Sequence, residues 1–158
     1  MVGFFAMLAL APWLHPLAFR PLPGWETGTS GTHSASVHGV VESSAWMAKD
    51  TAYLDRATAD PPYRTLAQLP RDGVIVWAGI FVPADDGAKA IQLALSKAKH
   101  FPCCDAATFA SGLYELSGSG PHRSYSVIVR IYFGSRPTAA LHAEAQRALD
   151  QLKLPSPA

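Results

Sequence analysis

The densest group of side chains able to do chemistry consists of His100, Cys103, Cys104 and Asp105. Zinc prefers imidazole and thiolate ligands, and a zinc site needs three or four of them in matched geometry. His100, Cys103 and Cys104 are therefore the candidate metal ligands. The spacing H-x-x-C-C-D matches no standard zinc pattern, and adjacent cysteines point apart in an extended chain. We favour the alternative for these residues, a loop with a buried thiol or with a cysteine that has an intermolecular partner.

Serine and histidine residues elsewhere give no catalytic set. His33 and His38 are the only two of the six histidines that lie close in sequence, and serines flank them in what reads as a solvated loop. Ser30 and Ser119 each lie between glycines, but neither has the strand-to-helix context of a nucleophile elbow. A nucleophile needs an activating base and an oriented partner. The sequence therefore assigns no catalytic residue, and it points to no cofactor.

Large aromatic side chains are the other candidates for contact with a ligand. Trp25 and Trp46 lie in less apolar segments than Trp77 and can line a groove over a sheet, together with Tyr132. These three are the candidate binding residues. Packing in the core is the alternative, because large aromatic side chains mostly fill protein interiors.

Composition limits the class of protein. The chain has 158 residues, the length of one domain, and 49% of them are hydrophobic while 16% are charged. It carries 13 basic and 12 acidic residues, which gives a net charge of +1. Nucleic-acid binding requires a strongly basic face, so we expect no nucleic-acid partner.

The N-terminal residues form an apolar leader. Val2–Leu14 carries no charge and has the length of a signal-peptide core, which is too short to span a membrane as a helix. We interpret residues 1–20 as a signal-like leader or, alternatively, as a buried N-terminal segment of a cytoplasmic protein. The first interpretation predicts a secreted or cell-envelope protein, with peripheral membrane association through the leader as a further option.

Alternating and apolar runs predict the strands. Val74–Val82 is a nearly continuous run of β-branched and aromatic residues, typical of a strand buried on both faces. The glycine-rich turn Ser117–Arg123 predicts a hairpin, and the alternation that follows it places Tyr125, Val127 and Ile131 on the core face. The other predicted strands are Trp25–Thr29, Val37–Ala48 and the two arms of the hairpin, Leu113–Leu116 and Ser124–Phe133.

Two segments have helical spacing. Thr138 can cap a C-terminal helix that runs to about Leu152, with a buried stripe at Leu141, Ala145, Ala148, Leu149 and Leu152. Ala84–Lys99 is ambiguous, because its apolar residues fit a helical face and also alternate as in a strand. We favour a helix there, since alanine, lysine, glutamine and leucine dominate the segment.

These elements predict an α+β domain, with a mostly antiparallel sheet and the C-terminal helix packed on one face. The domain spans residues 21–154, and residues 155–158 form a frayed tail.

Several short motifs carry a resemblance to known proteins. They are Pro23-Gly24-Trp25, residues 44–48 (SAWMA), residues 65–74 (TLAQLPRDGV) and Tyr132-Phe133-Gly134 before the last helix. Together they resemble a group of small uncharacterised secreted bacterial proteins that share a domain of unknown function. That resemblance implies an exported domain and supplies no catalytic residues. The order of elements is also similar to the PsbP/Mog1-type α/β/α sandwich, which implies a binding or scaffolding role.

The function that we expect is a non-enzymatic, exported binding or interaction module of the cell envelope, with a protein or small-molecule ligand that the sequence does not identify. Its contact surface would be the open sheet face or the loops Gly28–Ser36 and Ser117–Arg123. The alternative is a small hydrolase or metal-dependent enzyme that uses a histidine and cysteine cluster.

Overall fold

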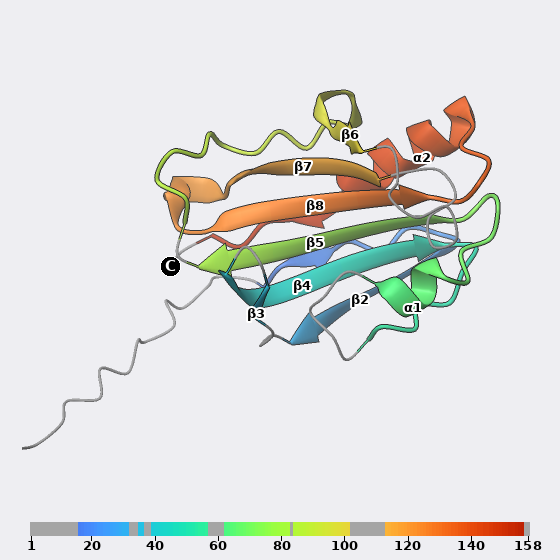
Figure 1. The fold of residues 1–158 in the computed structure, drawn as a ribbon, viewed down its shortest axis with the longest axis horizontal. Coiled ribbons are helices and arrows are strands. Elements are labelled where there is room, and N and C mark those ends of the chain that lie inside the picture. The colour runs from blue at the N-terminus through green and yellow to red at the C-terminus, as the bar shows by residue number, and fades with distance from the viewer. Residues whose placement is uncertain are drawn as a thin grey trace, which may run out of the picture.

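The computed structural model describes residues 16–31, 35–36, 39–56, 62–82, 84–101 and 113–156. Antiparallel ladders join its strands into a seven-stranded sheet, in the order β2-β4-β5-β8-β7-β6, with β3 paired to β4. Figure 1 shows the long central strands lying side by side. The strands of this sheet are β2 (Trp25–Gly31), β3 (Ala35–Ser36), β4 (Gly39–Lys49), β5 (Val74–Val82), β6 (Lys99–Phe101), β7 (Leu113–Ser119) and β8 (Ser126–Phe133).

The remaining elements are short, apart from one helix. A separate pair is formed by β1 (Ala18–Phe19) and β9 (Leu152–Lys153). The helices are α1 (Tyr63–Leu66) and α2 (Ala139–Leu149), and two 3-10 turns span Leu95–Lys97 and Pro121–Arg123. The mostly antiparallel sheet and the main helix near the C-terminus confirm the α+β class. No helix among the described residues is long and apolar enough to cross a membrane.

The predicted central strand is confirmed with its bounds unchanged. Every residue of β5 from Val74 to Phe81 is buried, and β4 and β8 flank the strand. Such a strand has no solvent-facing side, which explains why its sequence is a continuous apolar run instead of an alternation.

The predicted hairpin is also confirmed, with a tighter turn. Ser117 and Gly118 belong to β7, and its last residue, Ser119, pairs with Ser126. The alternation in β8 places Val127 and Ile131 in one core cluster and Ile128 and Tyr132 in another. The two faces of the sheet therefore carry two separate hydrophobic clusters.

The first cluster contains the core residues predicted for α2. Leu141, Ala145, Ala148 and Leu149 are buried there together with Val76 and Val129 of the sheet. The Thr138 hydroxyl accepts a hydrogen bond from the Leu141 N–H at 3.2 Å, which confirms the predicted N-cap. The helix ends at Leu149, earlier than expected, and Leu152 reaches the same cluster from β9.

The pairing of β9 with β1 brings the N-terminal side of the chain into the fold. Leu17 and Phe19 are buried in the first cluster, although both lie within the segment interpreted as a leader. Val2–Leu14 lies outside the described residues.

The helix favoured at Ala84–Lys99 does not form. The described part of this segment contains a turn closed by the Ala88 N–H and the Asp85 carbonyl, an isolated bridge from Ala90 to Ser119, and the 3-10 turn Leu95–Lys97. Ile91, Leu93 and Leu95 pack against the first cluster at every second position. Tertiary partners supply the backbone hydrogen bonds that a helix would make, because Ser119 bonds to Lys89 and Ile91, and the Gln146 side chain bonds to Leu93 and Leu95. Local helix propensity is a weak preference that such contacts override.

Candidate functional site

The structure does not bring the three predicted binding residues together on one exposed surface. Trp46 and Tyr132 are 2% and 4% exposed and belong to the second cluster. Trp25 is half-buried and packs against the first cluster. Residue parity is the cause, since Trp46 pairs with Gly28 of β2, and Trp25 lies three residues before Gly28 and so faces the other side of the sheet.

The second cluster is an aromatic layer over β4, β5 and β8. The ring of Tyr53 stacks on that of Trp46, with centroids 3.9 Å apart. The Arg130 guanidinium lies 6.0 Å from the centre of the Trp77 ring, which places a cation over this layer. Among the described residues, the indole N–H groups of Trp46 and Trp77 and the Tyr53 hydroxyl are buried without a hydrogen-bond partner.

The predicted metal ligands fall largely outside the described residues. His33, His38, Cys103 and Cys104 all lie there. His100 is exposed on β6, where its ring stacks on Tyr114 with centroids 4.5 Å apart. In the part of the chain that the structure describes, no group of three or more histidine, cysteine, aspartate or glutamate residues could hold a metal ion.

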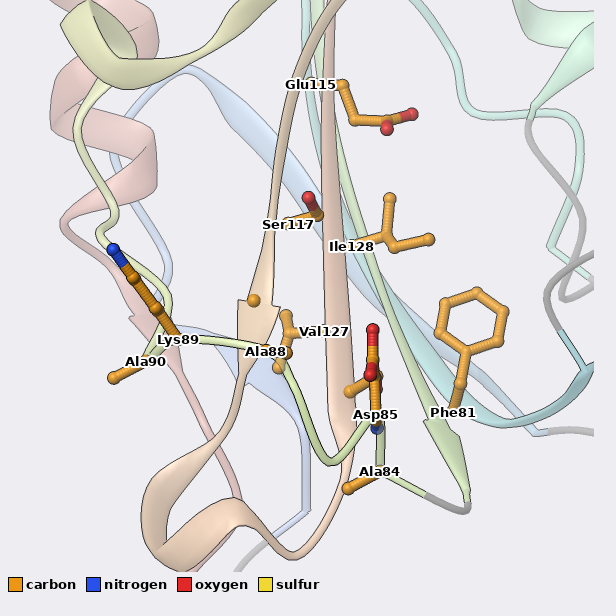
Figure 2. Close-up of a pocket in the computed structure, with 12 residues that line it drawn as sticks. Phe81, Ala84, Asp85, Ala88, Lys89, Ala90, Glu115, Ser117, Val127 and Ile128 are labelled. Carbon is orange, nitrogen blue, oxygen red and sulfur yellow. The ribbon is translucent and has the colours of Figure 1, made fainter.

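A pocket of about 540 Å³ lies beside the aromatic layer, between residues 84–90 and the strands β5, β7 and β8. Figure 2 shows its lining side chains. Its volume lies within the range of small-molecule sites. The residues that matter for its chemistry are Phe81, Asp85, Lys89, Glu115, Ser117 and Ile128.

The lining combines apolar side chains with hydrogen-bond acceptors. Phe81 and Ile128 are buried members of the second cluster, and Glu115 and Ser117 extend from the neighbouring strand. Asp85 is exposed and forms no ion pair within the described ranges. The Lys89 amine points away from Phe81 and Glu115 in Figure 2. Arg130 pairs with Glu115, so Asp85 is the carboxylate on this side of the pocket that has no ion-pair partner among the described residues.

Local hydrogen bonds fix the position of the Asp85 carboxylate. The Asp85 N–H donates to the Ser126 hydroxyl at 2.9 Å, which attaches the start of the 84–90 segment to β8. The Asp85 Oδ1 accepts a hydrogen bond from the Gly87 N–H at 3.0 Å. This is an Asx turn, in which an aspartate side chain bonds to the backbone two residues further along. Both bonds hold the carboxylate at the pocket before any ligand arrives.

Glu115 is held by a cross-strand ion pair. Its Oε2 accepts from the Arg130 Nε at 2.9 Å, and the two side chains are 20% and 19% exposed. Burial lowers the pKa of Arg130, but Tyr132 and Glu115 outweigh burial, so the pKa of Arg130 is raised overall. Burial raises the pKa of Tyr132 above its ordinary value of 10.0, and Arg130 offsets only part of that rise. At neutral pH Arg130 is thus charged and Tyr132 is neutral.

Sequence reasoning did not single out Asp85 and Glu115 as site residues. They are 30 positions apart, and only the sheet brings them to one pocket. One sequence feature could have pointed to Glu115: it has the opposite charge to Arg130, which lies opposite it on the paired strand. The predicted hairpin did not reveal this pairing, because a first arm that ends at Leu116 does not place Glu115 opposite Arg130.

Comparison with family models, curated proteins and solved structures gives no match for this chain.

Proposed function

We propose that the protein is a non-enzymatic binding module whose pocket between residues 84–90 and the β7–β8 hairpin takes a small organic ammonium ligand. The observation that carries this proposal is the joint presence of Asp85, Glu115 and the Phe81 ring around one cavity of about 540 Å³. Carboxylates and aromatic faces are the groups that recognise an ammonium, and an apolar floor accommodates its hydrocarbon part.

The arrangement of the sheet supports this location. The buried residues Leu141, Ala145 and Leu149 of α2 belong to the first cluster, so we propose that α2 covers that face. The pocket borders the second cluster, where Phe81 and Ile128 are the nearest apolar side chains. The open end of the second face is thus the surface left for a ligand.

The lining favours binding over nucleophilic chemistry. Among the described residues that line the pocket, none is a histidine, and neither of its two serines, Ser117 and Ser126, is hydrogen-bonded to a described carboxylate side chain. A serine without an adjacent base is a weak nucleophile.

Export of the module is a second part of the proposal, with processing that leaves Leu17 in the mature chain. Leu17 and Phe19 are core residues, so a mature chain that keeps this fold begins no later than residue 17. Intact-mass measurement by cell fraction tests this part. We expect a shortened chain outside the cytoplasm with Leu17 retained, and full-length protein in the cytoplasm would contradict export.

Amide chemical-shift mapping with benzylammonium tests the ligand proposal. We expect the largest saturable shifts at Gly118, Ile128 and Gly87, because these residues line or adjoin the pocket. Shifts confined to other surfaces, or no saturable shift at millimolar probe, would contradict it.

A further inference from the structure

A second cavity, of about 430 Å³, lies at the turn of the β7–β8 hairpin. Its lining includes Ile91, Ser119, His122, Arg123 and Leu154. We propose that this cavity binds a small organic anion, with a phosphate or carboxylate head group at His122 and Arg123 and an apolar body against Ile91 and Leu154. This anion site is separate from the ammonium pocket, because His122, Arg123 and Leu154 do not line that pocket.

Among the described residues that line this cavity, the ionisable side chains are all basic. His122 and Arg123 are exposed neighbours, and within the described part of the chain neither forms an ion pair. No aspartate or glutamate is among the described residues that line this cavity. A guanidinium presents several N–H donors in a planar fork, which matches the oxygens of a phosphate or carboxylate.

A buried hydroxyl supplies an independent reason for a ligand. Ser119 is 1% exposed, and its Oγ has no hydrogen-bond partner among the described residues. Burying a hydroxyl without a partner is unfavourable. The backbone of Ser119 is fixed, because its N–H donates to the Lys89 carbonyl at 2.8 Å and its carbonyl accepts from the Ile91 N–H at 3.0 Å. Ser119 lines the cavity, so a change in its side-chain rotamer would let the hydroxyl donate to an anion oxygen there.

The apolar wall determines the kind of anion. Ile91 comes from the extended segment, and Leu154 comes from the C-terminal tail, which the Tyr125 hydroxyl holds by donating to the Pro155 carbonyl. Bare inorganic phosphate would leave this wall without a partner. An anion with an attached hydrocarbon group would bury it and so bind more tightly.

Phenyl phosphate is the probe for the first test, with inorganic phosphate and benzoate as comparisons. We expect phenyl phosphate and benzoate to shift the amides of Gly120, Arg123 and Leu154, and inorganic phosphate to bind at least fivefold more weakly than phenyl phosphate. A stronger effect of phenyl phosphate than of benzoate identifies a phosphate head group, and the reverse order identifies a carboxylate. Equal binding of inorganic phosphate and phenyl phosphate would overturn the apolar part of the proposal, and no saturable shift at these amides would overturn it entirely.

Variants assign the head-group contact. Arg123 has a left-handed backbone (φ 54°), which asparagine tolerates, so Arg123→Asn removes the charge with little strain. We expect it to weaken phenyl phosphate binding at least fivefold. Arg136→Asn removes an exposed arginine that does not line the cavity, and it should leave the affinity unchanged. Equal effects of the two variants would show nonspecific charge attraction and contradict the site.

Ser119→Ala separates a ligand contact from a structural one. Because the hydroxyl has no described partner, its removal should leave the midpoint of urea unfolding unchanged or raise it, while phenyl phosphate binding weakens about threefold or more. A lowered midpoint with unchanged affinity would contradict the inference. Benzylammonium shifts at Gly118 and Ile128 report on the other pocket in the same samples, so each proposal can fail without the other.

Discussion

The phenol ring of Tyr53 stacks on the indole ring of Trp46, with ring centroids 3.9 Å apart and planes only 2° from parallel. The Trp46 ring also lies against Gly28, where an added Cβ would come within 2.4 Å of the indole. Trp46 is thus enclosed between a neighbouring strand and the segment that follows β4. This contact joins residues 50–56 to the sheet and buries the aromatic layer.

Gly28→Ala should destabilise the fold. The new methyl group would overlap the Trp46 ring, which Tyr53 prevents from moving outward. Overpacking of this kind costs about 1–3 kcal/mol, and urea unfolding would measure the loss. Gly87→Ala is the matched control, because its nearest contact is the Asp85 Oδ1 at 3.6 Å. An equal loss in both variants would show that the Trp46 contact is not responsible.

Stability should fall in alkaline solution. Burial raises the pKa of Tyr53, Tyr125 and Tyr132 above the ordinary value of 10.0, so the folded state holds protons that the unfolded state releases. This contribution is fully present below pH 10 and is lost as the pH rises through the folded-state pKa values. Absorbance at about 295 nm should show that three of the five tyrosines ionise only as the protein unfolds. Ionisation of all five before any loss of circular dichroism would contradict the burial of these rings.

Gln146 should hold the extended segment to α2. Its Oε1 accepts from the Leu95 N–H at 2.7 Å, and its Nε2 donates to the Leu93 carbonyl at 3.1 Å. Gln146→Ala removes both bonds, each of which contributes about 1 kcal/mol. We expect hydrogen exchange at the Leu95 amide to accelerate about fivefold or more. Gln146→Glu keeps the acceptor and should accelerate exchange less. Equal exchange rates in the wild type and both variants would show that the Gln146 side chain does not hold the segment.

The ion pair between Glu115 and Arg130 should couple β7 to β8. Both side chains are about four-fifths buried, and the hydrogen bond between them measures 2.9 Å. A double-mutant cycle with Glu115→Gln and Arg130→Met should give a coupling free energy of about 1–2 kcal/mol, as expected for a charge-assisted bond with limited screening. A coupling free energy near zero would indicate that the pair contributes nothing to the hairpin.

The sequence predicted those elements whose pattern is local. The run Val74–Val82 is buried on both faces as predicted. Val127, Val129 and Ile131 are buried as predicted too, but Ile128 and Tyr132 on the other face of β8 are also buried, so the choice of a single core face there was incomplete. Ala84–Lys99 was read wrongly as a helix, because the partners that favour an extended chain there, Ser119 and Gln146, lie far along the sequence.

The candidate sites were harder to predict, because they depend on strand register. Ser117–Arg123 was proposed as a contact loop, and the structure places Ser117 at the first pocket and Arg123 at the second. Asp85 and Glu115 line one pocket only because β8 positions both segments. Trp46 is buried in part by the ring of Tyr53, and the hydrophobic pattern of the sequence does not predict where that ring lies.

The most direct test of the central claim is the affinity for benzylammonium of the wild type, Asp85→Asn and Asp86→Asn, measured by amide-shift titration. The Asp85→Asn variant would keep a side-chain oxygen as acceptor for the Gly87 N–H while losing the charge, and Asp86 is an exposed neighbour outside the pocket lining. Because an exposed ion pair contributes up to about 1 kcal/mol, we predict that Asp85→Asn weakens binding by about threefold to fivefold and that Asp86→Asn leaves it unchanged. Equal affinities in all three proteins, or tighter binding of benzoate than of benzylammonium at Gly118 and Ile128, would contradict the account.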